Sequence, residues 1–144
     1  MKQQNYRNHV RWNPAFHFFL VPLGFIALSA AIVYLFVANW TTESVLASAL
    51  FISLSFISAM TLFMVRRFAC KVQDRAIRAE ENLRHYVLTG RLLDPRLTMG
   101  QITALRFASD DELPSLCEKA VNEQATPDSL KRSILSWRAD HERV

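Results

Sequence analysis

Glycine and cysteine are scarce in this sequence, and their scarcity excludes several classes of protein. The 144 residues contain three glycines, Gly24, Gly90 and Gly100, so no glycine-rich loop is available to hold a nucleotide phosphate. The cysteines, Cys70 and Cys117, form no C-x-x-C pair, and the four histidines are scattered, which argues against a zinc site. We therefore predict no metal or cofactor, no catalytic residue and no specific small-molecule ligand.

Charge is also missing from a long part of the chain. Between Phe16 and Val65, Glu43 is the only charged side chain. The apolar runs on either side of it are each about 20 residues long, which is the length that crosses the hydrocarbon core of a bilayer as a helix. We predict a transmembrane helical hairpin over residues 14–65, with spans at 16–38 and 44–66 joined by an outer loop at 39–43.

The first span follows a polar, basic arm, residues 1–13. Asn13 followed by Pro14 is typical of a helix start, with Asn as the cap and Pro at the first helical position. The alternative is a cleaved signal peptide. Against it, the apolar run is longer than a usual signal sequence, no A-x-A-like cleavage site follows, and a second span comes directly after.

Basic residues lie beside the apolar runs and are absent from the loop between them. Lys and Arg concentrate on the cytosolic side of membrane proteins, so we predict that both termini are cytosolic and that the loop is outside. The same residues would bind anionic lipid headgroups, which explains the sequence pI of about 9.4 better than nucleic-acid binding does. The predicted basic anchor consists of Arg7, Arg11, Arg66, Arg67 and Lys71.

The second span carries small and hydroxyl side chains. Ser48, Ser55 and Ala59 share one helical face, and small residues there permit close approach of another helix. We predict that this face packs against the first span or a second copy. The alternative is that it lines a polar pore, although a proton path would need an ionisable residue inside the membrane, and Glu43 lies at its outer edge and His17 near its inner one.

No proline or glycine lies between Ser44 and Gly90, so the second span should continue as one long helix into the cytosol. Residues 66–90 form its amphipathic, juxtamembrane part. Apolar residues recur there every three or four positions, which is the spacing of one helical face. We call this face the cytosolic stripe and predict that it packs against other helices: Phe68, Val72, Ala76, Ala79, Leu83 and Tyr86.

The opposite face of this segment is charged, and we expect it to be solvated. It carries Asp74, Arg75, Arg78, Glu81 and Asn82. Acidic residues precede basic ones by four positions in three pairs, an arrangement that stabilises a helix surface. These pairs are Asp74–Arg78, Glu80–Arg84 and Glu81–His85.

Residues 91–144 predict a cytosolic module of three short helices that covers the stripe. Capping boxes at Thr98-x-x-Gln101 and Ser109-x-x-Glu112 would open the first two helices, and Thr126-Pro127 the third. Ile134 and Trp137 should belong to the third helix. The second helix is acidic at its start, which argues against a DNA-reading helix-turn-helix.

Several stretches resemble a known family. They are Val72-Gln-Asp-Arg-Ala-Ile-Arg-Ala-Glu-Glu-Asn-Leu-Arg-His-Tyr, Leu97-Thr98, Gln101-Ile102-x-Ala104-Leu105-Arg106-Phe107-Ala108 and Ser109-Asp110. The chain resembles an uncharacterised family of small bacterial membrane proteins, a domain of unknown function, with two N-terminal spans and a cytosolic helical tail. The resemblance implies a location in the bacterial inner membrane. It implies no activity, cofactor or site.

The sequence thus predicts an all-α membrane protein, in which a two-helix hairpin extends into a long cytosolic helix and a small helical bundle. We expect a non-catalytic anchor, scaffold or accessory subunit of a membrane complex. Its partners would be the lipid bilayer and either other membrane subunits or a second copy, with no nucleic acid. The alternatives are a small homo-oligomeric channel lined by the serine-bearing face, and a membrane-anchored enzyme or regulator.

Overall fold

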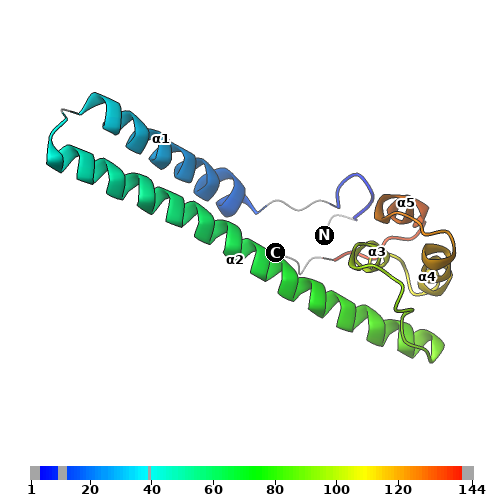
Figure 1. Ribbon diagram of the computed structural model, residues 1–144. Coiled ribbons are helices and arrows are strands. Elements are labelled where there is room, and N and C mark those ends of the chain that lie inside the picture. Colours follow the sequence, from blue (N-terminus) through cyan, green and yellow to red (C-terminus); the bar gives the residue numbers. More distant parts are fainter. Residues whose placement is uncertain (1–3, 10–12, 39, 141–144) are drawn as a thin grey trace. The chain divides into compact units, whose positions relative to one another are not determined.

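Helices make up all of the regular secondary structure in the described part of the chain. The computed structural model describes residues 4–9, 13–38 and 40–140 (Figure 1). Within these ranges it contains five α-helices and one short π-helix and no strand, which confirms the all-α prediction. The chain divides into two compact units. We call Trp12–Ala69 the hairpin unit, and Met1–Arg11 together with Cys70–Val144 the module.

The first apolar helix begins as a π-helix, η1 (Ala15–Leu20), and continues as α1 (Val21–Val37). The side chain of Asn13 accepts a hydrogen bond from the backbone N–H of Phe16 at 3.3 Å, as predicted for the helix start. Pro22 has no N–H, and its ring would crowd a carbonyl one turn earlier in a regular α-helix. The wider π-turns end at Leu20, two residues before this proline.

The second helix, α2 (Thr42–Thr89), runs without interruption for 48 residues. Thr41 caps its start, because its hydroxyl accepts from the N–H of Ser44 at 3.3 Å and its carbonyl from the N–H of Val45 at 3.0 Å. The helix ends where Gly90 adopts φ +72°, a left-handed conformation that favours glycine. The prediction of one long helix ending at Gly90 is confirmed.

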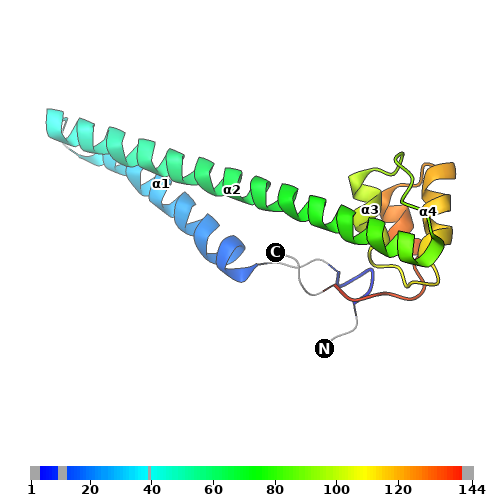
Figure 2. The same cartoon turned by 90° about the horizontal axis from the view of Figure 1, so that it is seen from below.

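Within the hairpin unit, α1 runs antiparallel beside α2 in both views (Figures 1 and 2). The rings of Tyr34 and Phe51 meet edge to face at 6.3 Å, and the guanidinium of Arg66 lies 5.0 Å from the ring centre of Phe16. Ala31 is the one described residue of α1 that is buried. Both helices are long and apolar enough to cross a membrane, and most of their large apolar side chains within the hairpin unit are exposed.

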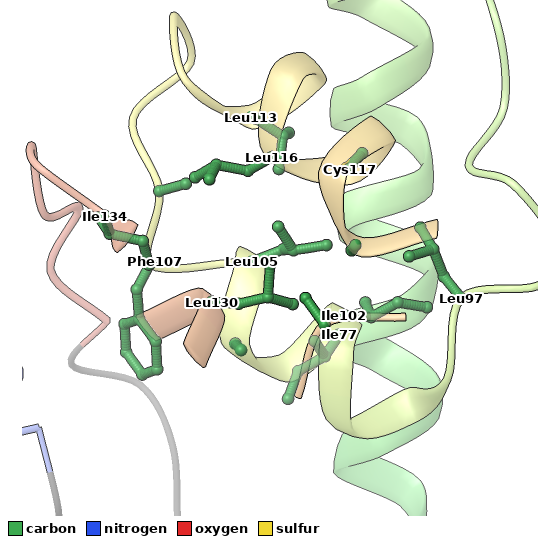
Figure 3. Close-up of a cluster of buried hydrophobic side chains, with 14 residues drawn as sticks. Ile77, Leu97, Ile102, Leu105, Phe107, Leu113, Leu116, Cys117, Leu130 and Ile134 are labelled. Atoms are coloured by element: carbon green, nitrogen blue, oxygen red, sulfur yellow. The ribbon is translucent and has the colours of Figure 1, made fainter. Parts of the chain in front are cut away.

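The module has a closed apolar core that three short helices build around one turn of α2. These helices are α3 (Met99–Leu105), α4 (Leu113–Asn122) and α5 (Pro127–Ser133), as the predicted count requires. Figure 3 shows Ile77 of α2 pointing into a cluster that the short helices and their connections supply. Its largest fully buried members are Phe107, Ile102, Leu105, Leu113 and Leu130.

Two of the three predicted helix starts are confirmed, and one is wrong. Thr98 and Gln101 form a complete capping box, and Thr126 caps α5. Ser109 and Glu112 do not form the predicted box, since α4 begins at Leu113 without a side-chain cap. The Glu112 carboxylate instead accepts hydrogen bonds from the backbone N–H groups of residues 135 and 136, at 3.2 and 3.0 Å. The chain returns past Glu112 after α5, and this returning segment occupies the carboxylate oxygens that a capping box would use.

That returning segment also corrects the assignment of Ile134 and Trp137 to the third helix. α5 ends at Ser133, Ile134 is already extended, and Trp137 pairs with Ala108 in an isolated antiparallel bridge. The N–H of Arg138 donates to the carbonyl of Phe107 at 2.8 Å. The rings of Phe107 and Trp137 lie 5.2 Å apart, so the tryptophan covers the core from an extended segment.

Gln101 links the parts of the module through a fully bonded buried amide. Its carbonyl oxygen accepts from the N–H and hydroxyl of Thr98, at 2.8 and 2.9 Å. Its amide nitrogen donates to the carbonyls of Ala120 and Ala125, at 3.2 and 2.9 Å. One side chain therefore holds the start of α3 against the end of α4. Gly100 permits close packing beside it, since a Cβ there would lie 3.1 Å from Pro127.

The end of α4 carries local strain at Gln124. This residue has φ +49°, and the N–H of Ala125 donates to the carbonyl of Ala120 at 3.2 Å, which is the pattern of a Schellman cap. A left-handed conformation costs a residue other than glycine roughly 1–2 kcal/mol. Glycine removes that cost but loses more chain entropy on folding.

Gln124→Gly should therefore stabilise the protein by about 0.5–1 kcal/mol, because the relief of strain outweighs the added entropy cost. Unfolding by denaturant in mild detergent, followed by circular dichroism, measures the change. Glu123→Gly is the matched control, since Glu123 has an ordinary φ of −95° and the change should destabilise. Equal losses in the two variants would contradict the strain.

Candidate functional site

Charged side chains from α2 and from the connections after α3 and α5 meet in the module. The guanidinium of Arg84 donates to Glu81 at 3.0 Å, to Asp110 at 2.7 Å and to the carbonyl of Ala108 at 2.7 Å. Glu81 is buried, and its second oxygen lies 3.9 Å from Arg138. We call Glu81, Arg84, Asp110 and Arg138 the charged cluster.

The charged cluster, with Glu80, lines an open cleft of about 340 Å³. Arg84 directs its donors at acceptors of the protein itself rather than into the cleft's solvent. Buried charges are tolerated when they are paired and hydrogen-bonded, and removing one partner leaves the other uncompensated. The geometry gives the cluster a structural task, which is to hold α2 against the segment 106–110.

The sequence pattern missed this cluster, and the expectation of a solvated face on α2 is wrong there. Arg84 pairs with Glu81 and Asp110 rather than with Glu80, and His85 Nδ1 lies 2.8 Å from the carbonyl of Arg91 rather than beside Glu81. The predicted pair at 74 and 78 is not among the ion pairs of the described residues. Local spacing says nothing of a partner 26 residues away.

The cytosolic stripe lies on the outside of the described structure. Phe68, Val72 and Leu83 are each about two-thirds exposed, and Ala76, Ala79 and Tyr86 are exposed as well. The short helices and their connections contact α2 at Ile77, Glu81 and Arg84, which lie on another side of the helix from the stripe at 100° per residue. The expectation that the C-terminal helices cover the stripe is therefore wrong. The apolar pattern indicated that the stripe would be the attached face of α2. Polar contacts attach a different face instead.

The predicted small-residue face of the second span is partly covered. Ser48 is buried, Ser55 is half-buried and Ala59 is exposed. The hydroxyl of Ser48 donates to the carbonyl of Ser44 at 2.8 Å, so the helix itself satisfies it. A buried serine whose hydroxyl bonds its own backbone favours helix packing over a water-lined wall.

The predicted basic anchor residues keep their charges accessible, except that Arg11 lies outside the described residues. Arg7, Arg67 and Lys71 are exposed, and Arg66 is half-buried over Phe16. The guanidinium of Arg66 over the Phe16 ring is a cation–π contact, which attracts the charge to the face of the ring.

The N-terminal arm belongs to the module. The Gln4 amide donates to the carbonyl of Asp140 at 3.1 Å and accepts from its N–H at 2.8 Å. The hydroxyl of Tyr6 donates to Asp128 at 2.7 Å and, with Arg132, lowers the pKa of that carboxyl. The ring of His9 lies 5.9 Å from that of Trp137. The arm therefore folds onto α5 and the segment after it.

Neither cysteine belongs to a metal or redox centre in the described residues, where no group of three or more His, Cys, Asp or Glu side chains could hold a metal ion. Cys70 is exposed and Cys117 is buried. Burial, and then the nearby charge of Glu81, raise the pKa of the Cys117 thiol to about 12. Cys117 is an apolar core residue that stays protonated.

Thiol labelling should therefore separate the two cysteines. In mild detergent at pH 8 we expect a maleimide to modify Cys70 and leave Cys117 intact, with both modified in denaturant. Raising the pH to 9 should not label Cys117, because its thiolate forms only near the raised pKa of about 12. Mass spectrometry counts the adducts, and two adducts on the folded protein would contradict the buried position.

The charged cluster predicts a large stability loss on removal of Arg84. Arg84→Met leaves Glu81 buried with only a distant arginine, and we expect the free energy of unfolding to fall by about 3–5 kcal/mol. Adding Glu81→Leu should recover part of the loss. Arg132→Met, which breaks the exposed pair with Asp128 at 2.9 Å, is the control and should cost less than about 1 kcal/mol. Denaturant unfolding compares them, and similar losses would contradict the burial argument.

Comparison with known proteins places the chain in a family. No curated protein and no solved structure matches it. A family model, described as a family of unknown function (DUF6526), matches residues 1–144. The match confirms the resemblance to an uncharacterised family and brings no activity, ligand or partner with it. Since the model covers the whole chain, the protein belongs to DUF6526, a family of unknown function.

Proposed function

We propose that this chain is a non-catalytic integral membrane protein that anchors a folded helical module at the cytosolic face of the bacterial inner membrane. The hairpin unit would span the bilayer, and the module would act as a scaffold or accessory subunit for other membrane proteins. The bacterial inner membrane comes from the family resemblance. The exposed apolar helices support the membrane anchor, and the contacts of the N-terminal arm support a common side for the two termini.

The observation that carries this proposal is the contrast between the two units. The module buries its large apolar side chains, among them Phe107 and Leu130, to below 2% exposure. The hairpin unit leaves side chains such as Phe25, Phe36 and Phe56 more than 60% exposed. Soluble proteins rarely expose apolar surface over a continuous area of this size. An apolar exterior on helices that bond their own backbone is the surface that lipid accepts.

The position of the arm supports a cytosolic location for both termini. Gln4 and Tyr6 precede the first span and contact Asp140 and Asp128, which follow the second. Contacts of this kind require the arm and the module to be on one side of the membrane. Two crossings return the chain to that side, and the loop without Lys or Arg would lie on the other.

Cysteine labelling in cells tests this topology. In a Cys70→Ser chain, Glu43→Cys places a thiol in the first turn of α2, and Ser129→Cys places one on exposed α5. A membrane-impermeant maleimide should label Glu43→Cys in intact cells, and Ser129→Cys only after the membrane is permeabilised. The protein should stay with the membrane in alkaline carbonate.

The Cys70→Ser chain without an added thiol is the control, and the buried Cys117 should leave it unlabelled. Labelling of Ser129→Cys in intact cells would overturn the cytosolic position of the module. Release by carbonate would overturn the membrane anchor. A purified protein whose mass lacks residues 1–38 would identify the first helix as a cleaved signal sequence.

A further inference from the structure

The apolar side of α2 beyond the span has a regular register that the folded module does not use. Its positions alternate in steps of three and four residues, which is the heptad spacing of a two-stranded coiled coil. The stripe residues from Val72 to Tyr86 follow this register, Ala69 extends it by one step, and Phe68 flanks it. We call the heptad positions the seam: Ala69, Val72, Ala76, Ala79, Leu83 and Tyr86.

We propose that a second copy of this chain covers the seam, in a parallel, in-register pair of α2 helices. This inference rests on the proposed membrane topology. Two copies inserted the same way in one membrane present their α2 helices in the same direction, so an antiparallel pair is excluded. Each seam residue of one copy then lies at the same depth relative to the membrane as the identical residue of the other copy.

The charges beside the seam fit that arrangement. With Ala76 and Leu83 at a and Val72 and Ala79 at d, Arg75 occupies a g position and Glu80 the e position of the next heptad. In a parallel pair these two positions face each other across the interface. Two-fold symmetry gives two such ion pairs, because Arg75 of each copy faces Glu80 of the other. An antiparallel pair would set g against g and e against e instead.

Both side chains are available for this contact. Arg75 and Glu80 are exposed, and neither belongs to an ion pair in the residues that the structure describes. The nearby charges on the other side of α2, Glu81 and Arg84, are already paired within the module. The fold therefore satisfies one set of charges internally and leaves a complementary set beside the apolar seam.

The membrane accounts for the shortness of the seam. Three heptads give only a weak pair in free solution, since short isolated helices are marginal in water. Two anchored chains move in one plane with their helices already formed and aligned, which raises their effective concentration. Alanine at positions 69, 76 and 79 permits close approach of the two helices.

Disulfide cross-linking of the full chain in membranes tests the pair. In the Cys70→Ser background, Ala79→Cys places a thiol at the centre of the seam, where two copies would bring their Cα atoms within disulfide reach. Arg78→Cys is the matched control, since it is the neighbouring exposed residue and faces away from the seam. Mild oxidation should give at least tenfold more covalent dimer from Ala79→Cys than from Arg78→Cys.

Charge reversal tests the parallel register with the same readout. Arg75→Glu and Glu80→Arg, each added to Ala79→Cys, should lower the dimer yield severalfold because they set like charges against each other. The two reversals together should restore it. All of these positions lie on the surface of the described chain, and an unchanged melting curve verifies that the module still folds.

Carbonate extraction of the same membranes separates the two proposals. A chain that stays in the membrane but gives equal yields from Ala79→Cys and Arg78→Cys overturns the pair and leaves the membrane anchor standing. A cross-link to a protein of another mass overturns a second copy as the occupant. Reversals that fail to rescue each other overturn the parallel register. Release of the chain by carbonate overturns the anchor and, with it, the membrane-imposed pairing.

Discussion

The hydrogen bonds that Arg84 makes to the segment after α3 are the contact on which the arrangement of the module depends. The Arg84 guanidinium donates to the carbonyl of Ala108 and the carboxylate of Asp110, and the buried Glu81, one turn earlier on α2, holds it in place. A long helix with an apolar face on one side would be expected to bury that face. Here the charged contacts, together with Ile77, attach the opposite face, so the apolar one is left outside the module's core.

The core that closes around this attachment depends on polar satisfaction as much as on apolar burial. Gln101 bonds four groups on three segments, and Glu112 bonds the returning chain at residues 135 and 136. An unpaired buried amide or carboxylate would cost more than its bond contributes, so these contacts also specify which segments meet. The helices of the module are short, and side-chain hydrogen bonds join them where few apolar residues are available.

The elements that local chemistry encodes could be predicted from the sequence. The glycine at position 90, the cap at Thr98 and the proline after Thr126 each act within one turn of chain, and the structure has a helix beginning or ending at each. The face of α2 that is buried could not be predicted, because hydrophobic periodicity does not register a buried glutamate that is paired with an arginine. The packing of the N-terminal arm on the module could not be predicted either, since Gln4 and Tyr6 form hydrogen bonds with residues more than 120 positions away.

With the proposed pair, the division of α2 into two faces would separate folding from association. Residues that hold the module together, such as Ile77 and Arg84, lie on one side of the helix, and the seam lies on the other. Changes at Ala79 or Leu83 should therefore affect contact with another chain while leaving the core intact. An apolar seam beside unpaired, complementary charges is a liability for a freely diffusing protein. The same seam suits a chain whose orientation a membrane restricts, because only helices that run in the same direction can then contact the seam. An identical chain inserted the same way has its α2 helix in that direction.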